Sequence, residues 1–309
     1  MPPTFNQKVI ARIPASTTNL GPGFDVLGLA LQLYSKVTLE TTETDTQVVV
    51  SGVDADKIPG TPEHIAFQAV ELVFNRSGTR PPKGFKLQIE NGIPAIRGLG
   101  GSGTAILGGL LTANLLCDSP FSDIELLNFA TELEGHPDNV AASLYGGIVV
   151  SALEEAQVHT VRLECPPVLS VVLAIPDFPL STEQARGVLP TSVSFADAIY
   201  NTSRSTLLIA SIATGQFEML PVAMKDRLHQ PYRASLIPGF DDVAKAATAA
   251  GALSVALSGA GPTVAAYCLD HTDQVAEQMK SAFKKHQIVS DIRILKPDVN
   301  GASVHIENT

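Results

Sequence analysis

The order of hydrophobic and polar positions divides the first half of the chain into short strands and longer helices. Alternating apolar and polar residues, bounded by Gly, Pro or Asn, are typical of strands, and apolar residues spaced by three and four are typical of helices. The predicted strands are 8–16, 35–42, 46–52, 84–91 and 145–153, and the predicted helices are 63–78, 104–116 and 121–136. Ser122 and Glu125 form the capping box that starts the last of these helices.

The second half of the chain continues with a mixture of strands and helices. The predicted strands are 169–176, 252–259, 264–269 and 291–297, and the predicted helices lie within 195–229, 239–251 and 273–286. Between 155 and 167 the chain turns polar and then Pro-rich, which predicts a domain boundary there and domains of 1–165 and 166–309. Because the elements lack strict β-α-β alternation, the pattern favours the α+β class.

Composition narrows the possible partners. The chain has 309 residues, of which 45% are hydrophobic, enough for two domains with a real core. Asp and Glu number 31 against 21 Lys and Arg, a net charge of −10. Such an acidic protein is not expected to bind nucleic acid or an anionic membrane. An anionic ligand such as ATP would need local devices, namely helix N-termini, a metal ion or a few well-placed Arg residues.

Cysteine usage and the absence of long apolar runs predict a cytoplasmic protein. Cys117, Cys165 and Cys268 are odd in number and far apart, so reduced thiols are expected rather than a disulfide framework or a zinc site. The N-terminal stretch lacks the apolar run of a signal peptide. No stretch approaches the ~18 uninterrupted apolar residues of a membrane-spanning helix.

The stretch GIPAIRGLGGSGTA, residues 92–105, contains the spacing GxGxxG at Gly98, Gly100 and Gly103. A dinucleotide-binding turn needs a strand that runs directly into the first Gly and an acidic residue at the end of the following strand. Here the strand ends near residue 89, and the acids at suitable distance begin a helix. A nicotinamide site is therefore rejected, and the P-loop pattern fails because no Gly-Lys-Ser/Thr follows.

What remains is a Gly-rich loop that leads into a helix N-terminus. Backbone N–H groups at such a place can converge on phosphate oxygens, and the helix dipole favours negative charge. Ser102 is then placed to offer a hydroxyl to a phosphate-bound Mg²⁺. Taken alone, the loop is equally compatible with a flexible Gly linker, because Gly mainly signals unusual backbone angles.

Several polar residues allow both a structural and a functional interpretation. Asn19 and Asp25 lie in a loop of turn-forming residues, where an Asx-turn is the simpler role. Glu132 and Glu134 fit a solvated helix face. A second group crowds into four residues after that helix, on an expected loop, and suggests a site: His136, Asp138 and Asn139.

Three stretches together resemble the GHMP kinases, the family named for galactokinase, homoserine kinase, mevalonate kinase and phosphomevalonate kinase. They are PASTTNLGPGFDVLGLAL (14–31), PAIRGLGGSGT (94–104) and LSGAGPTV (257–264). The resemblance implies a two-domain fold, with an N-terminal ATP-binding domain like domain 2 of ribosomal protein S5 and a ferredoxin-like C-terminal domain. It also implies ATP and Mg²⁺ as cofactors.

The resemblance assigns an ATP site to the Gly loop and to a second turn that closes it. The implied ATP-binding residues are Pro94, Ala95, Ile96, Arg97, Gly98, Leu99, Gly100, Gly101, Ser102, Gly103, Thr104, Ser258, Gly259 and Gly261. The chain departs from the family at Gly101, where a Ser is usual, and at His64, where many relatives carry an Asn near the adenine.

Further motifs look like the homoserine kinase branch of the family: EGHPDNVAASLYGG (134–147), STEQARGVLP (181–190) and DRLHQPYR (226–233). That branch phosphorylates L-homoserine on the route to threonine, and a homodimer is the family expectation. Asn19, Asp25, His136, Asp138, Asn139, Arg186 and Arg233 are the implied substrate-binding residues. Asp25 suits an ammonium group, and a guanidinium recognises a carboxylate bidentately.

The implied catalytic residues are Asp138, Ser102 and Thr182, and the implied metal ligands are Ser102 and Glu134, favoured over Glu132. Asp138 is either a base or a group that positions the hydroxyl, and phosphoryl transfer depends mainly on positioning and charge stabilisation. Two alternatives stay open: another small-molecule kinase of this family, or a non-catalytic ligand sensor with the same fold.

Overall fold

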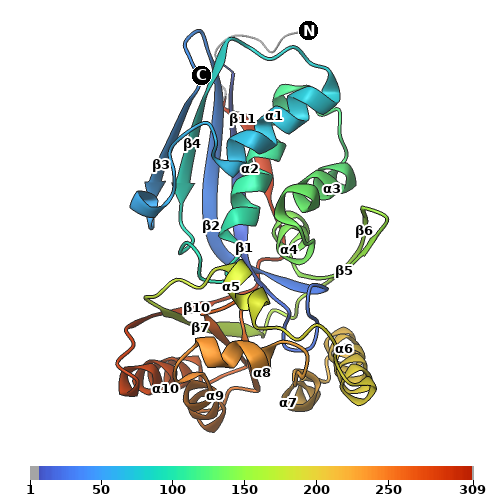
Figure 1. Ribbon diagram of the computed structural model, residues 1–309, viewed down its shortest axis with the longest axis vertical. Helices are drawn as coiled ribbons and strands as arrows, with labels where there is room; N and C mark the ends of the chain where they lie inside the picture. Colours follow the sequence, from blue (N-terminus) through green and yellow to red (C-terminus); the bar gives the residue numbers. More distant parts are fainter. Residues whose placement is uncertain (1–6, 308–309) are drawn as a thin grey trace.

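The computed structural model describes residues 7–307, and two sheets organise them (Figure 1). Within this range the larger sheet has seven strands, in the order β11-β1-β2-β4-β3, with β5 paired to β2 and β6 to β5. Its strands are β1 (Lys8–Thr18), β2 (Leu27–Thr42), β3 (Gln47–Gly52), β4 (Gly84–Asn91), β5 (Ile148–Glu154), β6 (Gln157–Leu163) and β11 (Ser303–Glu307). The pairs are antiparallel except for β3 with β4.

Four helices pack against one face of this sheet (Figure 1): α1 (Ile65–Ser77), α2 (Gly101–Leu116), α3 (Asp123–Glu134) and α4 (Asp138–Tyr145). The central helix, α2, contacts β1, β2, α1 and α3. It is buried on nearly all sides, in keeping with its apolar sequence. The main core lies between these helices and the sheet.

The smaller sheet has the order β10-β7-β9-β8 and is entirely antiparallel within the described part of the chain. Its strands are β7 (Ser170–Pro176), β8 (Ser254–Leu257), β9 (Val264–Cys268) and β10 (Ser290–Leu295). The helices of this half are α5 (Thr182–Gly187), α6 (Phe195–Thr214), α7 (Leu220–Ala223), α8 (Gln230–Arg233), α9 (Phe240–Ala249) and α10 (Thr272–Lys285). Figure 1 shows α5 at the level where the two sheets meet.

The α+β class and most predicted elements are confirmed, including the capping box at Ser122. The predicted helical region 195–229 is broken, because Gly215 ends α6 in a left-handed conformation. Asp138 and Asn139 were expected on a loop, but they form the first turn of α4.

Three strand segments were not predicted. β1 and β2 continue toward each other through Thr18 and Leu27, across a bulge between Pro14 and Ala15. β6 occupies part of the stretch interpreted as a polar linker, and it is an edge strand that pairs only with β5 within residues 7–307. β11 returns to the first sheet beside β1, so a single cut near residue 165 does not separate the strands of the two sheets. The domain boundary itself stays a prediction.

Among the described helices, none combines the length and apolar character needed to cross a lipid bilayer. The N-terminal segment that was inspected for a signal peptide falls partly on residues 1–6, outside the described residues.

Candidate active site

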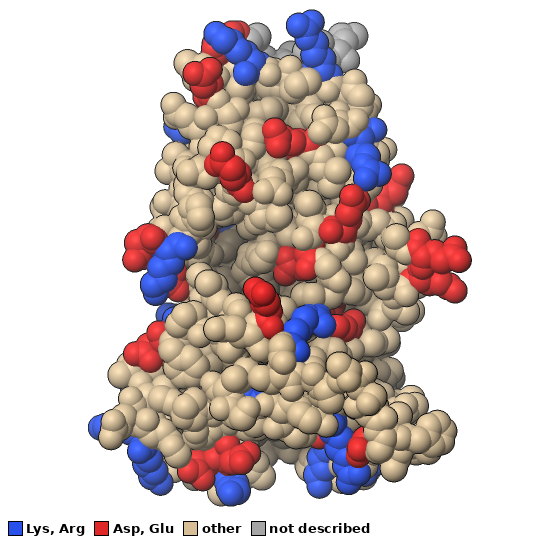
Figure 2. Space-filling view, viewed as in Figure 1, with Lys and Arg blue, Asp and Glu red and all other residues tan. Residues whose placement is uncertain are grey.

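A cavity of about 420 Å³ opens where the two sheets meet, and the predicted site residues converge on it. Figure 2 shows a hollow near the middle of this face, with acidic and basic side chains around its rim. Segments from both halves line the cavity: the Gly loop, the start of α4, the loop before β2, α5 and α8.

The Gly loop is held in shape by glycine geometry. Gly98 and Gly100 have φ angles of +72° and +74°, which only Gly adopts readily. A Cβ on Gly98 would lie 2.1 Å from the carbonyl oxygen of Ser258, and Ser258 Oγ donates a hydrogen bond to Gly98 O at 2.6 Å. The predicted second turn therefore packs directly against the loop.

The loop ends at the N-terminus of α2, as the anion-binding interpretation requires. The N-cap is Gly100, so no side chain covers the helix end. The backbone N–H groups of residues 101–103 find no acceptor among the described residues, and the first helical bond runs from Thr104 N to Gly100 O. Three donors and the positive end of the helix dipole are thus available for phosphate oxygens.

Position 101 has room for the serine that is usual in the family. A Cβ there would meet nothing nearer than Ile93 Cγ2, at 4.0 Å. The Gly at position 101 therefore lacks the hydroxyl of the usual Ser, although a Ser side chain would fit there.

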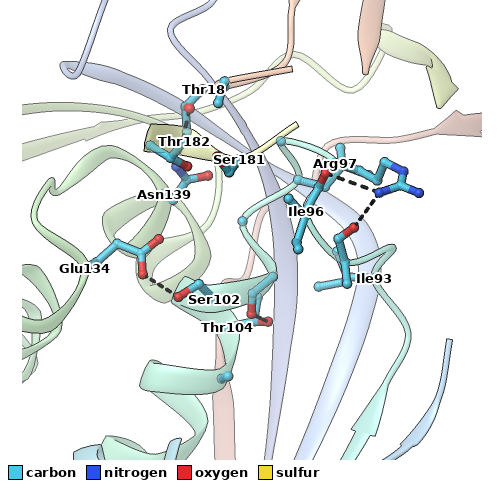
Figure 3. A pocket seen from close by; sticks show the side chains of 18 of the residues that line it. Thr18, Ile93, Ile96, Arg97, Ser102, Thr104, Glu134, Asn139, Ser181 and Thr182 are labelled. Carbon is cyan, nitrogen blue, oxygen red and sulfur yellow. Dashed lines mark hydrogen bonds between the residues drawn. The ribbon is translucent and has the colours of Figure 1, made fainter. Parts of the chain in front are cut away.

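The side chains of Ser102 and Glu134 lie next to each other at the cavity (Figure 3). Ser102 Oγ donates a hydrogen bond to Glu134 Oε2 at 2.8 Å. Burial raises the pKa of Glu134, and the hydrogen bond from Ser102 only partly offsets this effect. No Lys or Arg among the described residues forms an ion pair with Glu134.

A carboxylate and a hydroxyl beside a phosphate site match the oxygen ligands of Mg²⁺, which takes one or two protein groups and completes its shell with phosphate and water. No group of three or more His, Cys, Asp or Glu side chains suited to a metal ion occurs among the described residues, so a dedicated all-protein cage is not part of this site. Glu132 lies outside the cavity, where its carboxylate pairs with Arg76 at 3.2 Å.

Asp138 is buried, with 2% of its surface exposed, and is held by one of its two oxygens. Its Oδ1 accepts hydrogen bonds from His136 Nδ1 at 2.8 Å and from the backbone N–H of Asn139 at 2.9 Å. Oδ2 has no hydrogen-bond partner within residues 7–307. Burial lowers the pKa of His136, but its hydrogen bond to Asp138 and the nearby carboxylates outweigh burial and raise it overall.

The residues predicted for opposite ends of the substrate contact each other. Arg186 Nη2 donates to both carboxylate oxygens of Asp25, at 2.8 and 3.0 Å, and the two side chains are 38% and 35% exposed. Both polar atoms of the Asn19 side chain are hydrogen-bonded: its Nδ2 donates to Gly259 O at 2.9 Å, and its Oδ1 accepts from Asp25 N at 3.0 Å. Asn19 therefore stabilises the loop that carries Asp25.

Arg233 is buried, with 2% of its surface exposed, yet it lines the cavity. Burial, assisted by the charge of Arg186, lowers the pKa of Arg233 to about 10. The guanidinium is therefore still charged at neutral pH and suits an anionic group. Thr182, the first residue of α5, also lines the cavity and is exposed.

A third part of the cavity is mainly apolar, with side chains from β4, the Gly loop and the start of α1. His64 caps α1 here, because its Nδ1 accepts a hydrogen bond from Ala66 N at 3.1 Å. Burial lowers the pKa of His64. The sequence did not predict the remaining lining residues, which belong to strand ends, loops and helix starts: Thr18, Ser35, Ile58, Ile65, Ile89, Asn91, Ile93, Ala105, Leu180, Ser181 and Ala260.

Four of the predicted ATP-site residues do not contribute to the wall of the cavity. Pro94, Gly103, Ser258 and Gly261 do not line it. The guanidinium of Arg97 is also diverted, since it donates to the carbonyl oxygens of Ala95, Pro176 and Asp177, each at 2.9 Å. Arg97 therefore ties the loop to the end of β7.

A Gly loop on a helix N-terminus, beside a Ser–Glu pair and a buried Asp, is suited to binding phosphate groups and is the arrangement expected of a small-molecule kinase. Models of the GHMP kinases N terminal domain and of the GHMP kinases C terminal match residues 64–147 and 208–285, and the chain belongs to this family. Homoserine kinases of Moorella thermoacetica and Halothermothrix orenii are each 45% identical to it. The first match covers 96% of this chain and 99% of the relative, and the second covers 90% of each. The crystal structure of homoserine kinase from Cytophaga hutchinsonii has a TM-score of 0.89 and 27% identity, over 98% of both chains.

Proposed function

We propose that this protein is an ATP-dependent kinase that phosphorylates L-homoserine to O-phospho-L-homoserine, a step toward threonine. The observation that carries the proposal is a single cavity with a free helix N-terminus at one end and Asp25, Arg186 and Arg233 at the other. A substrate with an ammonium group, a carboxylate and a primary hydroxyl matches the second end. The names of the relatives support the same substrate.

In this proposal, the backbone N–H groups of residues 101–103 bind the phosphates of ATP. Mg²⁺ would be held by Ser102 and Glu134 and would neutralise charge on the transferring phosphoryl group. The mostly apolar part of the cavity beside His64 would receive the adenine.

Asp138 orients the hydroxyl of homoserine through its free Oδ2 in this proposal. His136 and the backbone N–H of Asn139 hold Oδ1, so the carboxylate has one fixed orientation. A fixed acceptor beside the phosphate site supplies the positioning that phosphoryl transfer mainly requires. The exposed hydroxyl of Thr182 would contact the transferring group from α5.

The carboxylate of homoserine would bind Arg233 and Arg186, and its ammonium group would bind Asp25. Arg186 uses only Nη2 for Asp25, and its Nε and Nη1 have no hydrogen-bond partner among the described residues. The Asp25–Arg186 pair can therefore stay intact while each member binds one end of the amino acid.

An ADP-release assay over a panel of substrates tests the proposal. The panel contains L-homoserine, 3-aminopropan-1-ol (homoserine without its carboxylate), mevalonate and hexoses. We expect activity with homoserine, and at least ~100-fold lower kcat/KM with 3-aminopropan-1-ol, because two charge contacts are lost. Preference for mevalonate or a hexose would point to another kinase of the family. ATP binding without turnover of any substrate would point to a ligand sensor.

We also propose a cytoplasmic homodimer. Cys117, Cys165 and Cys268 are unpaired and buried, which fits a reducing compartment. The dimer rests on the family resemblance, and sedimentation equilibrium would test it.

A further inference from the structure

His229 lies at a place in the fold that the proposed reaction does not use directly. It precedes α8 and stands four residues before Arg233, within the motif DRLHQPYR. Its side chain is fully buried, with 0% of its surface exposed. A buried histidine must find partners for both ring nitrogens or lose stability.

The two partners of His229 determine its tautomer. Nε2 lies 2.7 Å from the carbonyl oxygen of Gly21, which can only accept a hydrogen bond, so Nε2 carries the proton. Nδ1 lies 3.4 Å from Arg233 Nη1, which can only donate, so Nδ1 is the acceptor. The imidazole is therefore neutral. Burial lowers the pKa of His229 and outweighs the opposing effect of the buried Asp226 carboxylate, whose Oδ2 lies 3.6 Å from Nε2.

Arg233 has five N–H donors, and the protein uses three of them. Nε donates to Ala185 O at 3.1 Å, and Nη1 donates to Gly259 O at 3.1 Å and to His229 Nδ1. The two hydrogens of Nη2 have no hydrogen-bond partner within the described chain. Because Arg233 lines the cavity, Nη2 is the part of the guanidinium left for a bound carboxylate.

The same contacts link Arg233 to the loop that carries Asp25. Gly21 belongs to this loop, and Asn19 of the same loop shares the Gly259 carbonyl with Arg233. The Phe24 ring is stacked on His229, with centroids 5.1 Å apart, and lies 5.0 Å from the guanidinium carbon of Arg233. A closed ring of contacts thus runs from the loop through His229 and Arg233 to Gly259 and back to Asn19.

We propose that His229 is a positioning residue of the amino-acid site, a neutral imidazole protonated on Nε2 that joins the Asn19–Asp25 loop to Arg233 and aims Nη2 of Arg233 at the substrate carboxylate. The identity of that carboxylate rests on the proposed function. His229 acts only through its neighbours and does not line the cavity.

Two substitutions test the two hydrogen bonds of His229 separately, the one to Gly21 and the one from Arg233. His229→Gln keeps a donor near the Nε2 position and removes the acceptor for Arg233. His229→Asn keeps an acceptor near the Nδ1 position and removes the donor to Gly21. We expect each variant to raise the homoserine KM by about tenfold while the ATP KM changes by less than about twofold.

The substrate that lacks a carboxylate supplies the decisive readout. With 3-aminopropan-1-ol, His229→Gln should match the wild-type kcat/KM within about twofold, because this variant keeps the donor to the loop that carries Asp25 and because Arg233 has nothing to bind. His286→Asn is the matched control and should leave both substrates unaffected, because His286 ends α10, pairs with Asp242 of α9 and does not line the cavity. Equal losses of His229→Gln on the two substrates, or an unchanged homoserine KM in either variant, would overturn the proposal.

A spectroscopic test does not depend on turnover. NMR of the full-length protein labelled with ¹⁵N-histidine, with His229→Gln used to assign the signal, reports which ring nitrogen carries the proton. We expect the neutral Nε2–H form at pH 7, and an Nδ1–H or cationic ring would overturn the assignment. If the wild type fails to phosphorylate homoserine, the proposed function is wrong. The tautomer measured by NMR still tests whether His229 donates to Gly21 and accepts from Arg233.

Discussion

The two ends of the cavity are built in different ways. The proposed phosphate end is one continuous stretch, residues 98–104, where backbone N–H groups at the start of α2 are free to donate. The amino-acid end consists of charged side chains brought from distant segments, with Asp25 and Arg186 separated by 161 positions in the chain. The backbone donors do not depend on side-chain identity except where the loop requires glycine, at Gly98 and Gly100, whereas a side-chain site depends on each residue.

This difference predicts which kinetic constant each substitution changes. Substitutions at the amino-acid end should raise the homoserine KM, those at the phosphate end should lower turnover, and Asp138 at the junction should have the largest effect.

Asp138→Ala should lower kcat by roughly 10³-fold, because it removes the group that orients the hydroxyl, whereas Asp138→Asn should stay within about tenfold of the wild type. Asn keeps an oxygen for His136 and for the N–H of Asn139, and its Nδ2 can hold the substrate hydroxyl by donating to the hydroxyl oxygen. Steady-state kinetics of both variants test this expectation. A nearly inactive Asn variant with intact homoserine binding would mean that Asp138 is a required base.

Ser102→Ala should lower kcat by roughly 10²-fold without affecting the homoserine KM, since it removes a hydroxyl at the proposed metal site. Ser102 is exposed, so the melting temperature should change little. Thermal unfolding and kinetics on the same preparation separate the two effects. Near-normal turnover would exclude Ser102 from the metal site.

Arg186→Leu should raise the homoserine KM by about tenfold or more and leave the ATP KM within about twofold. The substitution also leaves Asp25 without its ion-pair partner, which weakens the orientation of the loop. Arg293→Leu, at a surface ion pair with Asp291 on β10, is the matched control. A rise in the ATP KM equal to the rise for homoserine would show that the two ends are not independent.

The smallest expected effect concerns pH and His136. Because the folded-state pKa of His136 is raised above its ordinary value of 6.5, its stabilising contribution is complete below about pH 6.5 and is lost as pH rises through the folded pKa. The difference in the free energy of unfolding between the wild type and His136→Asn should therefore shrink as pH rises. Urea denaturation across this range measures it, with the exposed His159→Asn as control. A difference that grows with pH would contradict the cause given for the shift.

Local patterns were sufficient to predict most helices and strands. The periodicity of α1, the capping box of α3 and the Gly-rich start of α2 depend on residues within about four positions of one another, and such short-range interactions are visible in the sequence. The resemblance to a family then indicated which polar residues meet, although periodicity alone left Asn19, Glu134 and Asp138 with structural alternatives.

The sequence by itself therefore determined the α+β class, most element positions and the candidate residues of the site. Only the tertiary structure decided that β6 and β11 are strands, because their partners β5 and β1 supply the hydrogen bonds that a short polar stretch lacks. It also decided that Glu134 rather than Glu132 faces Ser102, and that Asp25 pairs with Arg186. Contacts between distant segments depend on how the sheets and helices pack, and no local spacing of residues encodes that packing.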